Sequence, residues 1–360
     1  TLTLAQHVQG YRYGTIVGKH RCEGTMTRAS SGHIVTVFTL LTLLAGARLG
    51  GAMSPITSHV RSLQTPSRSA TSTRSTSTAP AVYATASLGD GPNKLATDTL
   101  SHRLFVVSYG EGRLREFDMG TGRLICSAPL GTEPFGIAVD PRTQRIFVAN
   151  YADGTVSVLQ ETLCTVVRTI AVGYQPVGVA VDEATGRVFV TNAGDGTVSI
   201  LRADTGQVVR TIDLGYGPIA VAIDGPARRF VVLDSVLNAA FVLDSATGRV
   251  ITGTLVGVGP VTLAIDAMHH RAYVPSYFGQ TVTVLDSRTG ATVANVRVGA
   301  GAYSVACDAV HGLAFVVSQS RNTVTALTTR GQIRWRVSIG AVGKAVSYTH
   351  LRAHETGRNL

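Results

Sequence analysis

The residues of this chain that could do chemistry fall into two sets with different spacing. The first set is aromatic and lies in segments rich in Gly and Pro, and a single lysine accompanies it: Tyr109, Tyr151, Tyr174, Tyr216, Tyr277, Tyr303, Phe135 and Lys94. Tyrosine combines a large contact area with a polar tip, so this set predicts a binding surface. Packing between neighbouring structural units explains the same residues equally well.

The same segments carry carboxylates but no histidine. The charged residues there are Glu111, Glu133, Asp153, Asp195, Lys94 and Arg321. Ser-His-Asp catalysis, haem ligation and a histidine metal site all need an imidazole, so we predict no catalytic residue, no metal and no cofactor at this surface. His350 and His354 have the i, i+4 spacing of a helical metal site, but we interpret the segment that holds them as non-native.

The second set is acidic and periodic. Aspartate recurs every 42 residues, nine positions after a glycine, at Asp98, Asp140, Asp182, Asp224, Asp266 and Asp308. Aspartate commonly accepts hydrogen bonds from turn amides, and a residue that every unit repeats is typical of a structural turn. We therefore expect these six residues to be turn residues, and we expect an arginine five positions later, such as Arg145, to pair with its aspartate.

Each 42-residue unit contains four short runs rich in Val and Ile, separated by turn residues. In the second unit the runs are FGIAVD, RIFVAN, TVSVLQ and TVVRTIAVG. These runs predict four β-strands, and the Thr-Gly pairs between the third and fourth strands predict glycine with positive φ. Four strands in about 40–45 residues is the repeat of a propeller blade. The predicted fold class is all-β, a β-propeller with six complete repeats and a partial seventh.

The sequence RVFVTN, followed by DGTVSIL and a Thr-Gly turn, resembles the YVTN-type β-propeller repeat proteins. The resemblance covers residues 89–340 and weakens in the first unit and at 215–257. It implies an exported, seven-bladed propeller, here truncated at its C-terminus, and it implies no particular reaction. We expect residues 82–88 to join the blade that begins at 340–346 and so to close the ring.

The composition changes outside the repeats and predicts five segments. They are a non-native segment or an upstream extension at 1–25, a signal peptide or uncleaved anchor at 26–47, a disordered Ser/Thr-rich linker at 48–80, the truncated propeller at 81–346, and a non-native tail at 347–360. Arg28 precedes an apolar run that ends at Ala45-Gly46-Ala47, which is the layout of a secretory signal. We expect an extracellular, periplasmic or cell-envelope protein.

The net charge of the folded domain indicates which partners are excluded. The chain has a net charge of +10, but residues 80–346 hold 22 Lys and Arg against 20 Asp and Glu, which leaves a net charge of +2. A folded domain so close to neutral argues against nucleic acid as the partner.

Cys126, Cys164 and Cys307 are interpreted as buried free thiols, and a Cys126–Cys164 disulfide is the alternative in an oxidising compartment.

Three function classes remain open on the sequence. The favoured one is an exported, non-catalytic and monomeric propeller that binds a protein, a peptide or an envelope glycan at the tyrosine-bearing end of its channel. The second is a lactonase- or lyase-type propeller enzyme, which the missing histidine weakens. The third is a single-stranded nucleic-acid binder that stacks bases on the tyrosines, but it lacks a cationic groove. A membrane would be contacted only through an uncleaved N-terminal anchor.

Overall fold

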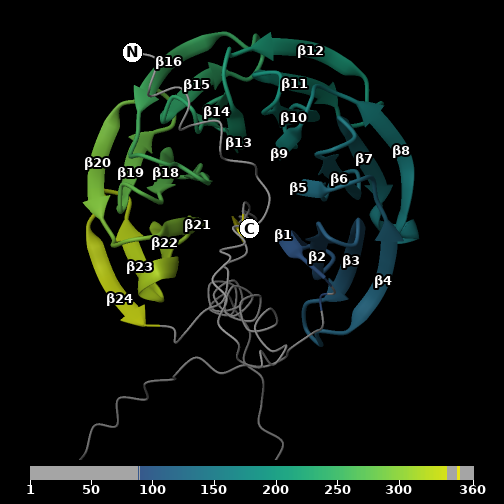
Figure 1. Cartoon of the computed structure of the whole chain (residues 1–360), viewed down its shortest axis with the longest axis horizontal. Coiled ribbons are helices and arrows are strands. Elements are labelled where there is room, and N and C mark those ends of the chain that lie inside the picture. The colour runs from purple at the N-terminus through teal and green to yellow at the C-terminus, as the bar shows by residue number, and fades with distance from the viewer. Residues whose placement is uncertain (1–87, 89, 339–346, 349–360) are drawn as a thin grey trace, which may run out of the picture.

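The computed structural model of the chain describes residues 88, 90–338 and 347–348. Within them the chain is all-β, with six sheets of repeated antiparallel strands, as predicted. Figure 1 shows the sheets arranged around a central axis, with the first strand of each sheet innermost and the fourth outermost. The predicted leader, the linker, the closing segments at 82–87 and 340–346, and His350 and His354 lie outside the described residues.

Each repeat forms one sheet, which is a blade of the propeller. The blades of the first three repeats are β1 (Pro92–Asp98), β2 (Arg103–Ser108), β3 (Arg113–Asp118) and β4 (Leu124–Pro129); β5 (Pro134–Asp140), β6 (Arg145–Asn150), β7 (Thr155–Gln160) and β8 (Thr165–Ala171); and β9 (Pro176–Asp182), β10 (Arg187–Asn192), β11 (Thr197–Arg202) and β12 (Val208–Asp213). The blades of the last three are β13 (Pro218–Asp224), β14 (Arg229–Asp234), β15 (Ala239–Asp244) and β16 (Val250–Leu255); β17 (Ala264–Asp266), β18 (Arg271–Ser276), β19 (Thr281–Asp286) and β20 (Thr292–Arg297); and β21 (Ala302–Asp308), β22 (Leu313–Ser318), β23 (Thr323–Thr328) and β24 (Ile333–Ser338). The short helices η1 (Glu161–Leu163) and η2 (Gln319–Arg321) complete the second and sixth blades.

The core lies between the faces of neighbouring blades. The second and third strands of each blade are largely buried, whereas outermost strands such as β12 and β24 are largely exposed. Phe189 of the third blade packs on Phe230 of the fourth, with ring centroids 4.5 Å apart. Because a single four-stranded sheet would leave both apolar faces in water, each blade is stabilised by its neighbours.

The six periodic aspartates end the innermost strands. Each is buried, and Oδ1 of each accepts a hydrogen bond from a backbone amide two or three residues later, as Asp140 does from Arg142 at 3.1 Å. The Thr-Gly turns contain glycines with φ between 69° and 75°, as predicted, at Gly122, Gly206, Gly248 and Gly290.

The expected pairing of Arg145 with Asp140 is wrong. The Nη1 of Arg145 instead donates to the carbonyl oxygen of Ala203, in the next blade, at 2.6 Å. Arg187 makes the equivalent bond to Ser245 one blade further on, also at 2.6 Å. The guanidinium is long enough to cross the blade boundary, and Arg271 likewise donates to Thr329 of the next blade. Arg103 and Arg229, in contrast, pair with carboxylates of their own blades.

The cysteines differ from the favoured interpretation. Cys126 and Cys164 form a disulfide that joins the outer part of the first blade to that of the second. The two cysteines occupy different positions of the 42-residue register, so the repeat gives no indication that they meet. The short helix η1 places Cys164 beside β4. Cys307 is free and buried, as predicted.

The described strands leave an interval between β24 and β4 (Figure 1). Next to it, the two-residue strand β25 (Ser347–Tyr348) pairs in parallel with β1 at Lys94 and Leu95. Leu88 is buried beside Val317 and Val324, so the first and sixth blades share one apolar cluster. None of the helices in the described residues is long and apolar enough to cross a membrane.

Candidate functional site

The central channel contains a cavity of about 100 Å³. Each blade contributes the side chain four positions after its repeat glycine, and these six are Asn93, Phe135, Val177, Ile219, Val261 and Tyr303. Three further apolar side chains, Ile137, Val179 and Val221, complete the wall. Of these six residues, only Phe135 and Tyr303 were predicted from the sequence, although counting from the glycine in every unit would have found the others.

The first blade differs from the others at the position five residues after its repeat glycine. Here the other five blades have small residues, Gly136, Gly178, Ala220, Thr262 and Ser304, whereas the first blade has Lys94. A Cβ on Gly136 would overlap the carbonyl oxygen of Val177 on the neighbouring innermost strand. A side chain at this position therefore points toward the next blade, and Lys94 is the one long side chain so placed.

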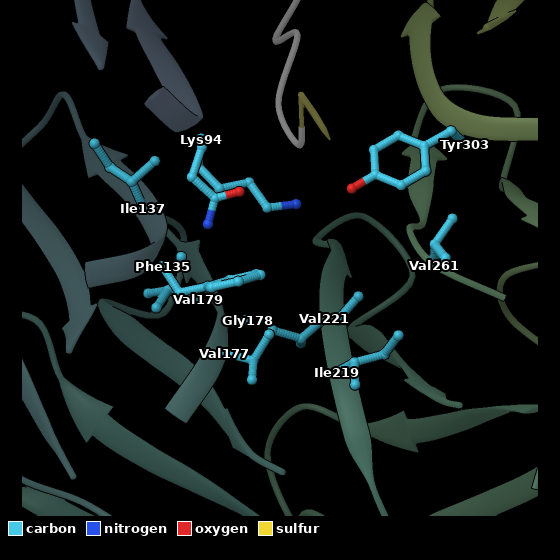
Figure 2. A pocket seen from close by; sticks show the side chains of 13 residues that line it. Lys94, Phe135, Ile137, Val177, Gly178, Val179, Ile219, Val221, Val261 and Tyr303 are labelled. Carbon is cyan, nitrogen blue, oxygen red and sulfur yellow. The ribbon is translucent and has the colours of Figure 1, made fainter. Parts of the chain in front are cut away.

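Lys94 lies among apolar groups. Its Nζ is 5.8 Å from the centroid of the Phe135 ring, within the range of a cation–π interaction. Burial lowers the pKa of the Lys94 ammonium to about 8, and no carboxylate in the described part of the chain forms an ion pair with it. Figure 2 shows the amine of Lys94 and the hydroxyl of Tyr303 facing each other across the cavity.

Two aromatic clusters flank the cavity. On one side, Phe135 contacts Tyr109 edge to face, with ring centroids 6.5 Å apart, and Tyr151 at 6.4 Å. On the other side, Tyr303 meets Tyr277 at 6.3 Å. Burial, together with a hydrogen bond to Glu133, raises the pKa of Tyr109 to about 12, so its hydroxyl stays protonated at neutral pH. We call Lys94, Phe135, Tyr303, Tyr109, Tyr151 and Tyr277 the channel group.

Tyr174 and Tyr216 do not belong to the channel group. Their side chains are 58% and 52% exposed, and neither lines the cavity. A Cβ on Gly194 would contact the Tyr174 ring, so that ring lies over the turn between β10 and β11. Six of the eight residues predicted for binding therefore come together around the channel, and two lie elsewhere.

The carboxylates of these loop segments have partners within the loops. Asp153 accepts a hydrogen bond from the backbone amide of Thr132 at 2.7 Å, and Asp195 accepts one from Tyr174 at 2.5 Å. Glu111 pairs with Arg115 and accepts from the amide of Asp90. These groups hold one loop against the next and leave Lys94 as the charged group that lines the cavity.

The histidines and the candidate metal ligands lie away from the channel group. His269 and His311 sit beside the periodic turn aspartates Asp266 and Asp308, with Nδ1 to Oδ2 distances of 2.8 and 2.7 Å. Glu116, Cys126 and Cys164 bring three ligand atoms within 4.8 Å of one another. Because the two sulfurs are bonded to each other, that group offers no thiolates in this state.

No family model matches the chain, and no curated protein sequence matches it. Among solved structures, a chain of the hydrazine synthase of Kuenenia stuttgartiensis is similar, with a TM-score of 0.64 and 18% sequence identity over 71% of this chain and 88% of that one. At this identity the likeness concerns the fold alone. It supports a β-propeller repeat protein, and YVTN-type membership remains a prediction.

Proposed function

We propose that this protein is an exported, non-catalytic β-propeller that binds a peptide or an envelope glycan at the channel group. The observation that carries the proposal is the convergence of five aromatic rings and one ammonium group around one apolar cavity. Aromatic rings beside a polar head are the usual composition of a recognition site.

The cavity is smaller than a pocket for a drug-sized molecule, which is about 300 Å³ or more. A macromolecular ligand would therefore lie across the aromatic clusters and place only one small group in the cavity. Tyr109, Tyr151 and Tyr277 are partly buried and positioned by ring contacts, so little side-chain freedom is lost when a ligand covers them.

Export agrees with the cysteine chemistry. A disulfide such as Cys126–Cys164 persists in oxidising compartments and is rare in the cytosol. We therefore retain the assignment of residues 26–47 as a leader, and N-terminal sequencing of the exported product tests it. A product that keeps residues 26–47 intact in the cytoplasm would contradict the assignment.

The binding proposal is tested by screening the full chain against arrays of envelope glycans and peptides. The variant Tyr151→Ala/Tyr277→Ala removes one ring from each aromatic cluster, and we expect it to weaken binding at least about tenfold, which matches the loss of one or two well-packed aromatic contacts. The matched comparator is Tyr174→Ala/Tyr216→Ala, which removes two exposed rings outside the channel group and should leave the affinity within about twofold.

The opposite ranking of the two double variants would place the ligand on the outer loops and overturn the proposal. Turnover of a lactone by the full chain would replace it with the enzyme alternative. Salt-dependent binding of single-stranded oligonucleotides that is lost in Tyr151→Ala/Tyr277→Ala would replace it with the nucleic-acid alternative.

A further inference from the structure

Lysine is rare in this chain. It occurs at Lys19, Lys94 and Lys344, whereas the other basic residues among the 32 Lys and Arg are arginines. Only Lys94 lies in the described residues, and it lines the central cavity. Arginine stays protonated in proteins, whereas a desolvated lysine can lose its proton and become a nucleophile. The one lysine of the described blades thus lines a cavity that a small molecule could enter.

Two features of the surroundings favour a neutral amine over an ammonium group. The cavity wall includes Val177, Val179 and Val221, so little solvation is offered to a charge. In addition, the described residues provide no carboxylate ion pair for Lys94.

We propose that the Nζ of Lys94 captures a small aldehyde or ketone as an imine inside the channel cavity. The nitrogen lone pair attacks the carbonyl carbon and forms a C–N bond, which gives a carbinolamine. The carbonyl oxygen then leaves as water, taking two protons that balance those lost from nitrogen, and a C=N bond remains. No oxidant or reductant is consumed, and hydrolysis reverses the step.

Two further residues suit this chemistry. The hydroxyl of Tyr303 faces the amine across the cavity (Figure 2), so it can donate a proton toward the oxygen that departs from the carbinolamine. The carboxamide of Asn93, on the same strand as Lys94, also lines the cavity and can hydrogen-bond the same oxygen. The volume of about 100 Å³ admits compounds of the size of acetaldehyde or propanal.

The protonation state agrees with the geometry. With a pKa of about 8, half of the Lys94 amines are neutral at pH 8, compared with roughly one in 300 for a lysine at the ordinary value of 10.5. Lys19 and Lys344 lie outside the described residues and provide comparison amines within the same molecule.

The test is reductive trapping on the full chain. The protein is incubated at pH 8 with acetaldehyde or propanal and cyanoborohydride, and peptide mass mapping then gives the rate of alkylation at each amine. We expect Lys94 to react about tenfold or more faster than Lys19 and Lys344. We also expect its rate to reach half of its maximum near pH 8. Equal rates at the three lysines, or no adduct at Lys94, would overturn the proposal.

Two variants sharpen the test. Lys94→Met should remove the fast adduct and leave the two reference lysines unchanged, and Tyr303→Phe should slow trapping at Lys94 without moving its pH midpoint. If a variant fails to fold, the comparison of the three lysines in the unaltered protein still decides the question. The proposal goes beyond partner binding: failed trapping would leave the peptide or glycan proposal standing, and failed glycan and peptide screens would leave the trapping result standing.

Discussion

The two ends of the innermost strands follow the 42-residue register to different degrees. At the end where these strands stop, all six blades have the same residue, and Asp98, Asp182 and Asp308 each bind a turn amide through Oδ1. At the channel cavity, where the strands begin, the six equivalent side chains include an amide, an aromatic ring and aliphatic groups, as Asn93, Phe135 and Val177 illustrate.

The difference separates what the fold requires from what it permits. The turn that closes each hairpin needs a side-chain acceptor for one of its amides, so the aspartate recurs in every blade. The cavity wall requires only that neighbouring innermost strands approach closely. Gly136 and Gly178 allow this approach because they have no side chain. Lys94, at the equivalent position of the first blade, has a long side chain instead. A residue that breaks the register at a cavity is therefore a better candidate for ligand chemistry than one that repeats it.

The first prediction tests the close approach and has the largest expected effect. Gly136→Ala places a Cβ against the Val177 carbonyl, and because backbone cannot move aside cheaply, we expect a loss of about 3 kcal/mol in the free energy of unfolding. The control is Gly120→Ala in an exposed turn at the other end, where the nearest atom would be 3.5 Å away. Urea denaturation measures both, and equal losses in the two variants would contradict this account of the innermost strands.

Much of the fold could be predicted from the sequence because the repeat is strict. Four strands per unit and the positive φ of Gly206 and Gly248 follow from local patterns that recur in each copy. The register did not favour the disulfide, which was the alternative interpretation of Cys126 and Cys164, and it did not give the partner of Arg145, since both interactions cross blade boundaries. The register shows which residues of different blades occupy equivalent positions, but it does not show how far one side chain reaches into the next blade.

The candidate site was predicted less completely for a related reason. Tyr174, Tyr216 and Tyr303 share one loop type in the sequence, but only Tyr303 lines the cavity. Asn93 and Val261 were missed because their residue types are unremarkable and only their register position marks them. The charge of Lys94 marks it in the sequence. That it is the one long side chain, where the other five blades have small residues, becomes clear only when the innermost strands are aligned.

The second prediction concerns the residue that departs from the register. Because the pKa of Lys94 is about 8 in the folded protein and 10.5 is the ordinary value, the unfolded chain binds more protons between these pH values. The stability of the unaltered protein should therefore rise across this range. Lys94→Met retains the packing without the titration and should be more stable by about 2 kcal/mol at pH 7, a value reduced from full linkage for residual solvent contact.

This advantage of Lys94→Met should shrink as the pH rises from 8 and vanish near 10.5. Urea denaturation of the two proteins at matched pH values measures it, and other titrating groups cancel in the difference. Lys94→Arg is the control, because a guanidinium stays charged over this range and should lack the pH-dependent gain. A constant difference between Lys94→Met and the unaltered protein would show that the amine is not desolvated.

The third prediction returns to the end that keeps the register and has the smallest expected effect. Asp182 is buried, and its Oδ1 accepts a hydrogen bond from the amide of Ala184 at 3.1 Å. Asp182→Ala leaves that amide without its partner, so we expect a loss of about 1 kcal/mol in the free energy of unfolding and a decrease of about 2–4 °C in the melting temperature.

Asp182→Asn retains an acceptor oxygen and should recover most of the loss, whereas Asp204→Ala, at an exposed ion pair with Arg202, should leave the melting temperature unchanged. Calorimetry on the three variants decides: if Asp182→Ala and Asp204→Ala melt together, the periodic aspartates are not turn residues, and the contrast between the two ends fails.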